Sequence, residues 1–416
     1  MNAQDVLSSR EKGLIYSRIA PLQSGKGHGW VTTRSQDAEG GGFAYIFTAS
    51  SSVLGFVYVQ NRKHWLVRLP SASSALFAAT LCGCSSSAPS SLASAPPTDL
   101  GSLSKPAVVT ARDGGAAALV GGRMLWTFGD TLMTVTGADG FNYRSATAGW
   151  SSPGSLQLDE ALDAAGAPFQ LFPLTADEAA YNQAHGPTER YALWPGSVIE
   201  APDGNGAWIF YQRLKIHPGA LNYEALDVGL ARLALGSTVA VRDPSPLFSV
   251  PAPAYALAAH VDEGFVYLYG CKSIAGQLDS ECRVVRAAVA DAASASAWKA
   301  YDGAAWQPDL GQAQPVLHGP PGDLSVSFNA YLGQFLAVYS GIFSNDIRWR
   351  SSPHPEGPWS TEQLLFTTPA PPSGDNYAGK EHPELAVDHG KTIAVSYAQP
   401  TGTFTGDVRL ASVALP

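Results

Sequence analysis

Charged side chains are scarce in this chain, at 15% of 416 residues, and the formal net charge is −9. Only 26 residues are Lys or Arg, against 35 Asp or Glu, which argues against nucleic acid as the main partner because phosphate binding needs a basic face. Helical periodicity is nearly absent, and we predict one short helix at residues 175–184. The 42 glycines and 30 prolines are instead typical of a turn-rich globular protein built from strands.

Several familiar site motifs are also missing. The chain has no Gly-x-Ser-x-Gly, no phosphate-binding Gly-Lys-Ser loop and no His-Glu-x-x-His, so Ser-His-Asp catalysis has no support. A zinc site is not indicated, because there are only four cysteines and no paired histidines at ligand spacing. Cys271 and Cys282 flank a polar turn, and an oxidising compartment would allow them to form a disulfide worth roughly 3 kcal/mol.

A segment well inside the chain resembles a secretory signal. Basic residues at 62–68 precede a short, mainly apolar run at 69–81, which is too short to span a bilayer. The run ends in Leu81-Cys82-Gly83-Cys84, which resembles a bacterial lipobox and predicts that Cys84 carries a lipid. An ordinary signal peptide, cut near an Ala or a Gly, is the alternative.

These features predict four regions. Because a signal that starts so late is unusual, we expect residues 1–58 to be a mistranslated or disordered leader, with the true start near residues 53–59. Residues 59–84 would be the signal. Residues 85–105, rich in Ser, Ala and Pro, are expected to form a flexible tether, and residues 106–416 the folded domain.

One strand pattern recurs five times in this domain. Each copy has a Gly turn followed by an apolar or aromatic strand that ends in an aromatic residue; the copies are 122–128, 206–211, 264–269, 333–339 and 390–397. Most are followed by a second strand, at 228–233, 282–286, 346–350 or 408–413. Five sheets, each too small to bury its own core, predict an all-β, five-bladed β-propeller. A β-sandwich with coincidental spacing is the alternative.

Leu125–Thr131 is the most informative stretch, because an apolar strand runs straight into Gly129-Asp130-Thr131. We interpret these three residues as a turn that leaves the Asp130 carboxylate at the end of a strand. Asp113 lies 17 positions earlier (130 − 113), which fits the neighbouring strand of the same hairpin. Two carboxylates facing one cleft are the minimum needed to break a glycosidic bond. Plain turn roles for both residues are the alternative.

Further polar residues are expected at the same mouth of the propeller channel, where the innermost strands start. Glu384 of the last blade should converge with the two aspartates, because the first and last blades are neighbours once the ring closes. Candidates for stacking on sugars, binding their hydroxyls or supporting Glu384 are Arg190, Tyr191, Trp194, Ser327, Asn329, Tyr377 and His382. The alternatives are a core position for Trp194, a water-facing strand surface for Ser327 and Asn329, a structural role for His382 and a solvated edge position for Glu384.

Five short phrases together resemble a bacterial family long catalogued only as a domain of unknown function: 125–131, 193–196, 266–270, 357–360 and 382–384. Some members are endo-D-arabinanases, glycoside hydrolases that cut the D-arabinan of mycobacterial cell envelopes. The resemblance covers about residues 106–416. It implies a five-bladed propeller in which Asp113 and Asp130 are the catalytic pair. Trp359, in a motif common at the blade edges of sugar-cleaving propellers, is expected to plug between adjacent sheets.

The expected reaction is hydrolysis of a furanose-containing polysaccharide, most of all a D-arabinan-type glycan, by two carboxyl groups. The expected reaction requires no metal or cofactor, and an ion bound in the channel is the alternative. We expect inversion, with Asp113 as base and Asp130 as acid; Glu384 is a third candidate for the acid, and retention is the alternative.

The protein is expected to be an exported monomer, on the outer membrane or cell surface or free in the periplasm or medium, that touches a membrane only through its N-terminal lipid. Two rival hypotheses have no catalysis. One is a glycan-binding lipoprotein propeller, and the other is a surface interaction scaffold whose acids only form turns.

Overall fold

The computed structural model describes residues 31–36, 43–48 and 96–416, except 220–221, 276, 278 and 320–322. The chain divides into two compact units, Met1–Ser85 and Ser86–Pro416. In the first unit the described residues form an antiparallel hairpin of β1 (Val31–Gln36) and β2 (Phe43–Thr48). The predicted signal, Cys84 and the rest of the predicted leader lie outside the described residues.

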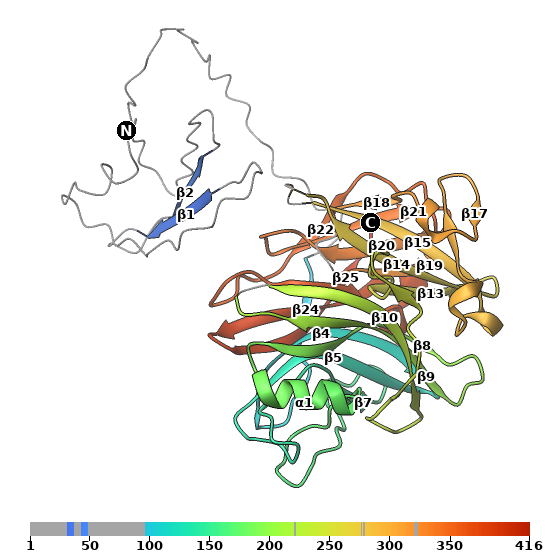
Figure 1. Cartoon of the computed structure of the whole chain (residues 1–416). Coiled ribbons are helices and arrows are strands. Elements are labelled where there is room, and N and C mark those ends of the chain that lie inside the picture. Colours follow the sequence, from blue (N-terminus) through green and yellow to red (C-terminus); the bar gives the residue numbers. More distant parts are fainter. Residues whose placement is uncertain are drawn as a thin grey trace, which may run out of the picture. The chain divides into compact units, whose positions relative to one another are not determined.

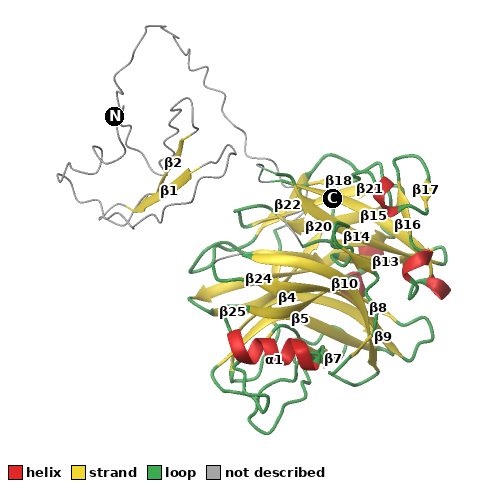
Figure 2. Cartoon of the chain, viewed as in Figure 1, coloured by secondary structure: helices red, strands yellow, loops and turns green. Residues whose placement is uncertain are grey.

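The regular secondary structure of the second unit is mainly strands, joined by turns and loops (Figures 1 and 2). They form five antiparallel sheets, and four of these are built from strands close together in the sequence. The first sheet contains β4 (Val109–Val120), β5 (Arg123–Met133), β6 (Tyr143–Arg144) and β7 (Thr147–Ser151). The second contains β8 (Arg190–Glu200), β9 (Gly206–Ile216), β10 (Tyr223–Ala234), β11 (Val241–Arg242) and β12 (Phe248–Ser249).

The remaining sheets follow in chain order. The third contains β13 (Ala258–Asp262), β14 (Phe265–Ser273), β15 (Ser280–Ala288), β16 (Lys299–Tyr301), β17 (Trp306–Gln307) and β18 (Leu317–His318). The fourth contains β19 (Ser325–Asn329), β20 (Gln334–Ser340), β21 (Asp346–Ser352) and β22 (Gln363–Thr367). The fifth contains β23 (Tyr377–Glu381), β24 (Thr392–Gly402), β25 (Thr405–Ala414) and β3 (Thr98–Ser102).

The five sheets are the blades of a five-bladed β-propeller, as predicted. The innermost strands, β4, β8, β13, β19 and β23, each contact the next, and β23 contacts β4, which closes the ring. The outer strand of the last blade is β3, which comes from the start of the domain and pairs with β25. The tether predicted for residues 85–105 is therefore wrong at Thr98–Ser102. Pairing there covers the exposed edge of β25 and joins the two ends of the ring.

The hydrophobic core lies between the blades. Five clusters of buried side chains fill the five interfaces, from the one between blades one and two to the one between blades five and one. The aromatic residue that ends each repeated phrase is buried in one of these clusters; they are Phe128, Tyr211, Tyr269, Tyr339 and Tyr397. The repeat exists because each blade buries its faces only against its neighbours.

The predicted helix is α1 (Ala176–His185), which begins at a capping box formed by Thr175 and Glu178. Short 3₁₀ segments occur at Val289–Asp291, Ala295–Ala297, Leu310–Gln312, Pro383–Leu385 and Asp388–Gly390. Within the described residues, no helix is long and apolar enough to cross a membrane.

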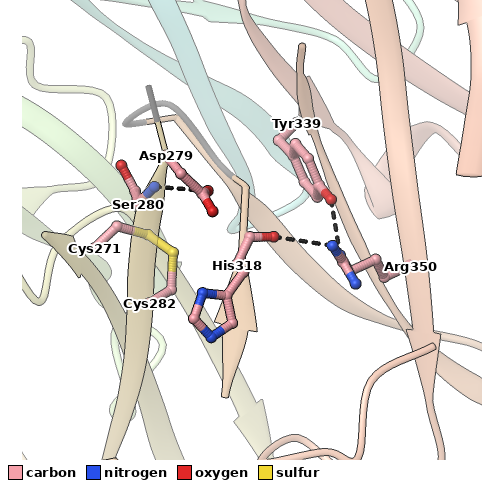
Figure 3. The surroundings of a disulfide bond; sticks show 7 residues. All are labelled: Cys271, Asp279, Ser280, Cys282, His318, Tyr339 and Arg350. Carbon is pink, nitrogen blue, oxygen red and sulfur yellow. Dashed lines mark hydrogen bonds between the residues drawn. A yellow bond between two sulfur atoms is a disulfide. The ribbon is translucent and has the colours of Figure 1, made fainter. Parts of the chain in front are cut away.

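A disulfide joins two strands of the third blade, and a tryptophan packs at the interface between the third and fourth blades. Cys271 and Cys282 face each other on β14 and β15 and are disulfide-bonded, as the sequence suggested (Figure 3). Nearby, Arg350 of the fourth blade donates to the Tyr339 hydroxyl at 2.9 Å and to the His318 carbonyl of β18 at 3.0 Å (Figure 3). Trp359 packs against the cluster between these two blades, in the structural role predicted for it.

A lysine ammonium divides the central channel into two cavities. Lys380 of β23 is buried, and its Nζ donates to the carbonyl oxygens of Gly196, Leu257 and Leu324 at 3.0, 2.8 and 3.0 Å. These carbonyls belong to the second, third and fourth blades. Gly196 and Leu257 line both cavities, so the ammonium lies where the two cavities meet. We call the end where the innermost strands begin the first mouth, and the opposite end the second mouth.

Candidate active site

The first mouth is a cavity of about 260 Å³ that brings together residues from all five blades. The residues used below that line it are Asp113, Gly129, Trp194, Gln212, Tyr223, Asp323 and Tyr377. The disulfide stiffens its rim, because Cys271 also lines the cavity. Three aromatic side chains beside carboxyl groups give this mouth both a stacking surface and ionisable groups, the combination a sugar site needs.

The Asp113 side chain lies against Gly129 of the neighbouring strand, β5. In β4 the pairing with β5 slips at bulges on either side of Gly114, and both Gly114 and Gly115 have positive φ angles, 79° and 117°. Bulges of this kind redirect side chains. The Asp113 carboxyl packs directly on Gly129, where a methyl group would overlap Oδ1. Gly129 is therefore required by the close approach of Asp113.

The turn predicted at Gly129-Asp130-Thr131 is not a turn. These residues continue β5, which ends at Met133, and Thr131 is paired with Arg112. The hairpin of two acids is nevertheless present, since Asp113 is on β4 and Asp130 on β5. The strand continues because Thr131 is paired on both sides, with Arg112 of β4 and Arg144 of β6.

Asp130 is held by two donors from the second blade. The Arg190 guanidinium donates to Oδ2 at 2.8 Å, and the Trp194 indole N–H donates to Oδ1 at 3.1 Å. Arg190 itself lies over the Tyr143 ring, 4.9 Å from its centroid, and donates to the Pro187 carbonyl. Charge-assisted hydrogen bonds of this kind stabilise an ionised carboxylate.

Asp113 has no such cation. The only side chain that hydrogen-bonds to it in the described part of the chain is Tyr377, whose hydroxyl donates to Oδ2 at 3.3 Å. Desolvation, together with the negative charges of Asp130 and Asp323, raises the pKa of Asp113 to about 8. Asp113 is thus mostly protonated at neutral pH. The arrangement can supply a proton from Asp113 and accept one at Asp130, the opposite of the roles expected from the sequence.

The first mouth contains three residues that the sequence reasoning missed. Asp323 lies two residues before β19, and its charge acts on Asp113, Tyr223 and Tyr377. Tyr223 packs edge-on against Trp194, with ring centroids 5.3 Å apart, and Gln212 lines the same wall. Asp323 could have been found, because it follows the rule already used for Asp113: an acid where an innermost strand begins. Tyr223 and Gln212 come from outer strands and carried no such signal.

Glu384 does not converge with the aspartates. It lines the second mouth with Glu381 and His382, beyond the Lys380 ammonium, so the prediction of a shared site is wrong. Glu381 is the last residue of β23 and the other two follow it, whereas Tyr377 at the start of this strand lines the first mouth. His382 is also not placed to bind substrate beside the aspartates. It is buried, its Nε2 is 2.7 Å from the Ser396 hydroxyl, and it packs on Trp126.

Three more predicted contacts lie away from the first mouth. Tyr191 lines a separate cavity beside α1 and packs edge-on against Tyr181. Ser327 is buried and donates to Glu381 at 2.5 Å, and Asn329 is buried with its amide donating to the Gly390 carbonyl at 2.8 Å. Arg190, Trp194 and Tyr377 are the predicted contacts that the fold brings to the acids.

Comparisons with known proteins agree with the propeller. Residues 241–401 match a family described as a domain of unknown function, DUF4185, a stretch that excludes the hairpin of Asp113 and Asp130. Among curated proteins, none matches the chain.

Solved structures of similar fold include a protein of Bacteroides ovatus ATCC 8483 classed provisionally as a hydrolase. It is 16% identical with a TM-score of 0.55, over 74% of this chain and 87% of that one. A GH43_1 enzyme of Xanthomonas citri bound to xylotriose is 13% identical with a TM-score of 0.47, over 76% and 90%. The levansucrase of Gluconacetobacter diazotrophicus is 12% identical with a TM-score of 0.46, over 79% and 86%. Identities this low show a likeness of fold alone.

Proposed function

We propose that this protein is a glycoside hydrolase whose acid and base are Asp113 and Asp130. The observation that carries the proposal is the opposite surroundings of two carboxyl groups on one hairpin. One is bound by a guanidinium and an indole N–H, and the other is desolvated beside two further carboxylates. Two carboxyl groups held side by side in unlike surroundings are the arrangement that acid/base catalysis uses.

In the proposed reaction the protonated Asp113 donates its proton to the glycosidic oxygen as the bond to the anomeric carbon breaks. Ionised Asp130 takes a proton from the attacking water, whose oxygen forms the new bond to that carbon. Each turnover leaves Asp113 ionised and Asp130 protonated, and proton exchange with solvent restores both. Trp194, Tyr223 and Tyr377 would contact the sugar rings. We expect inversion at the anomeric carbon, which NMR of the first product would test.

For the substrate we propose a furanose polysaccharide of the D-arabinan type. The support is the ordered set of phrases shared with a family that includes endo-D-arabinanases, and the match of residues 241–401 to a domain of unknown function. The test is incubation of purified protein with D-arabinan, arabinogalactan and xylan, followed by reducing-end detection and product sizing. New reducing ends from D-arabinan that disappear in Asp113→Asn support the proposal. Binding without any cleavage would favour the glycan-binding propeller instead.

Export and a lipid at Cys84 remain part of this proposal, because an arabinan substrate lies outside the cytoplasm. The support is the basic and apolar run that ends in the Cys82-Gly83-Cys84 phrase. Mass spectrometry of the native N-terminal peptide provides the test. A diacylglyceryl group on Cys84 is expected, and peptides from residues 1–50 would contradict the proposed start.

A further inference from the structure

The lining of the first mouth has acidic side chains and no basic ones. Among the described residues that line this cavity, Asp113 and Asp323 carry carboxyl groups, and none is a Lys, Arg or His. Two cations beside the cavity already have partners, because Arg190 is paired with Asp130 and the Lys380 ammonium is bound by three carbonyls. A negatively charged ligand would therefore enter the first mouth against negative charge that no cation of the lining balances.

Asp323 is the acid of this cavity that has no partner. It is half-buried, and within the described residues its carboxylate forms no hydrogen bond and no ion pair. Desolvation raises the pKa of Asp113, Tyr223 and Tyr377, and the negative charge of Asp323 adds to the rise in each case. These three residues belong to the first, second and fifth blades, so the Asp323 charge acts across the whole mouth.

Two further polar side chains of the cavity are accessible to a ligand. Gln212 is half-buried and Ser273 is exposed, and neither side chain forms a hydrogen bond within the described part of the chain. An amide and a hydroxyl both donate and accept hydrogen bonds, whereas a carboxylate only accepts them. A simple cation would use the acceptors alone, but sugar hydroxyls, which donate and accept, match all three side chains. The rings of Trp194 and Tyr223 add a surface on which a sugar ring can pack.

We propose that Asp323 determines which sugars the first mouth accepts: its carboxylate binds hydroxyl or ammonium groups of a glycan unit and excludes units that carry a carboxylate or a phosphate. A neutral sugar would donate neighbouring hydroxyls to Asp323 and pair with Gln212 and Ser273. An amino sugar would pair its ammonium with the same carboxylate. The inference rests on the proposed function in taking the ligand to be a glycan, but it does not require cleavage.

The test compares three ligands of similar size that differ in one group. They are methyl D-arabinofuranoside and its two analogues in which the hydroxymethyl group at C5 is replaced by a carboxylate or by an aminomethyl group. Binding to the full-length protein is measured by isothermal titration calorimetry at about pH 6, where the carboxylate and the amine are both ionised. We expect the neutral sugar and the amine to bind about tenfold more tightly than the carboxylate, and the difference to shrink at high salt.

Two variants assign the effect to one carboxyl group. Asp323→Asn keeps the shape of the side chain and removes its charge, so in this variant the carboxylate analogue should bind about as tightly as the neutral sugar. The matched control is Asp375→Asn. Asp375 lies two residues before β23, as Asp323 lies two residues before β19, but Asp375 is exposed and does not line the cavity. This control should keep the order of affinities seen in the unaltered protein.

Any of four outcomes would overturn the inference. None of the three ligands binds, or the carboxylate binds the unaltered protein as tightly as the neutral sugar, or Asp323→Asn keeps the same order as Asp375→Asn. The fourth is binding of the amine alone, which would identify a site for organic cations. The expected order in a protein that does not cleave D-arabinan would refute the proposed hydrolysis and not this inference. If Asp323→Asn does not fold, the order in the unaltered protein still decides.

Discussion

Two carboxyl groups can be compared at each mouth of the channel, but only at the first mouth do they have different surroundings: Asp113, which lines the cavity, and Asp130, which lies beside it on β5. Asp130 has Arg190 and Trp194, whereas Asp113 has a tyrosine hydroxyl and negative neighbours. At the second mouth, burial raises the pKa of both Glu381 and Glu384 to about 7. Neither glutamate has an ion-pair partner within the described residues.

The difference teaches that a pair of acids alone does not define an active site. Acid/base catalysis needs one group charged and one protonated at the same pH, so the two environments must differ. At the first mouth, donors from a neighbouring blade bind one carboxyl group and leave the other without a cation. At the second mouth, burial shifts the pKa of both glutamates in the same direction, so this asymmetry is missing there.

Removal of the charged member of the first pair should have the largest effect. Asp130→Asn should lower kcat/KM on D-arabinan at least about 10³-fold, because the base is lost while the surrounding donors stay. Reducing-end assays with a thermal melt provide the measurement. Asp291→Asn, an exposed carboxyl far along the chain, is the control. Undiminished activity in Asp130→Asn would show that Asp130 is not the catalytic base.

Removal of the Lys380 ammonium, which lies between the two mouths, should lower the stability of the protein. Lys380→Met leaves three buried carbonyls without a donor, so the free energy of unfolding should fall by about 3 kcal/mol. Urea unfolding followed by tryptophan fluorescence measures it. Lys299→Met replaces an exposed lysine of β16 and should change it by less than about 0.5 kcal/mol. Equal stability of the two variants would mean that the ammonium does not hold the blades together.

A subtler change at the first mouth removes a single donor. Trp194→Phe keeps an aromatic ring but deletes the N–H that binds Asp130, so kcat/KM should drop about tenfold. Trp306→Phe at the edge of the third blade serves as the control. Full activity in Trp194→Phe would show that Arg190 alone suffices.

The pH profile tests the negative surroundings of Asp113. Since Asp113 must be protonated to act as the acid, kcat/KM should fall as the pH rises through about 8. The Asp323 charge contributes to this raised pKa, so Asp323→Asn should move the alkaline limb down by up to about one pH unit. If the alkaline limb of Asp323→Asn lies at the same pH as that of the unaltered protein, the Asp323 charge does not raise the pKa of Asp113.

The last prediction concerns the dependence of stability on pH. Because the pKa of Asp113 is raised on folding, the folded state holds a proton that the unfolded state loses between about pH 4 and pH 8, and stability falls as the pH rises through this range. Asp113→Asn should therefore stabilise the protein at pH 8 and change its free energy of unfolding by almost nothing near pH 3. Urea unfolding at both pH values provides the measurement. If Asp113→Asn raises the free energy of unfolding equally at pH 3 and pH 8, the raised pKa of Asp113 is not the cause.

Several features could be predicted because they depend on local sequence. The repeated phrases ending at Phe128 and its four counterparts identified the blades, since each must bury an aromatic between sheets. The pairing of Cys271 with Cys282 follows from one hairpin, and so does the shared hairpin of Asp113 and Asp130. The match of residues 241–401 to a known family adds no information on those acids.

The end of the channel that each residue faces could not be predicted. A strand rises about 3.3 Å per residue, so the four steps from Tyr377 to Glu381 cover roughly 13 Å and pass from one mouth to the other. Glu384 was misplaced for this reason. Ser327 and Asn329 were misjudged because their partners, Glu381 and Gly390, come from another blade.

The sequence by itself determined the number of blades, the position of the acidic hairpin and the net negative charge, since each follows from spacing or composition along the chain. Only the tertiary structure decided which acid has its pKa raised, where the channel is divided and which carboxyls meet. Those properties depend on groups from different blades, Arg190 beside Asp130 and Lys380 against three carbonyls, and on the solvent that their packing excludes.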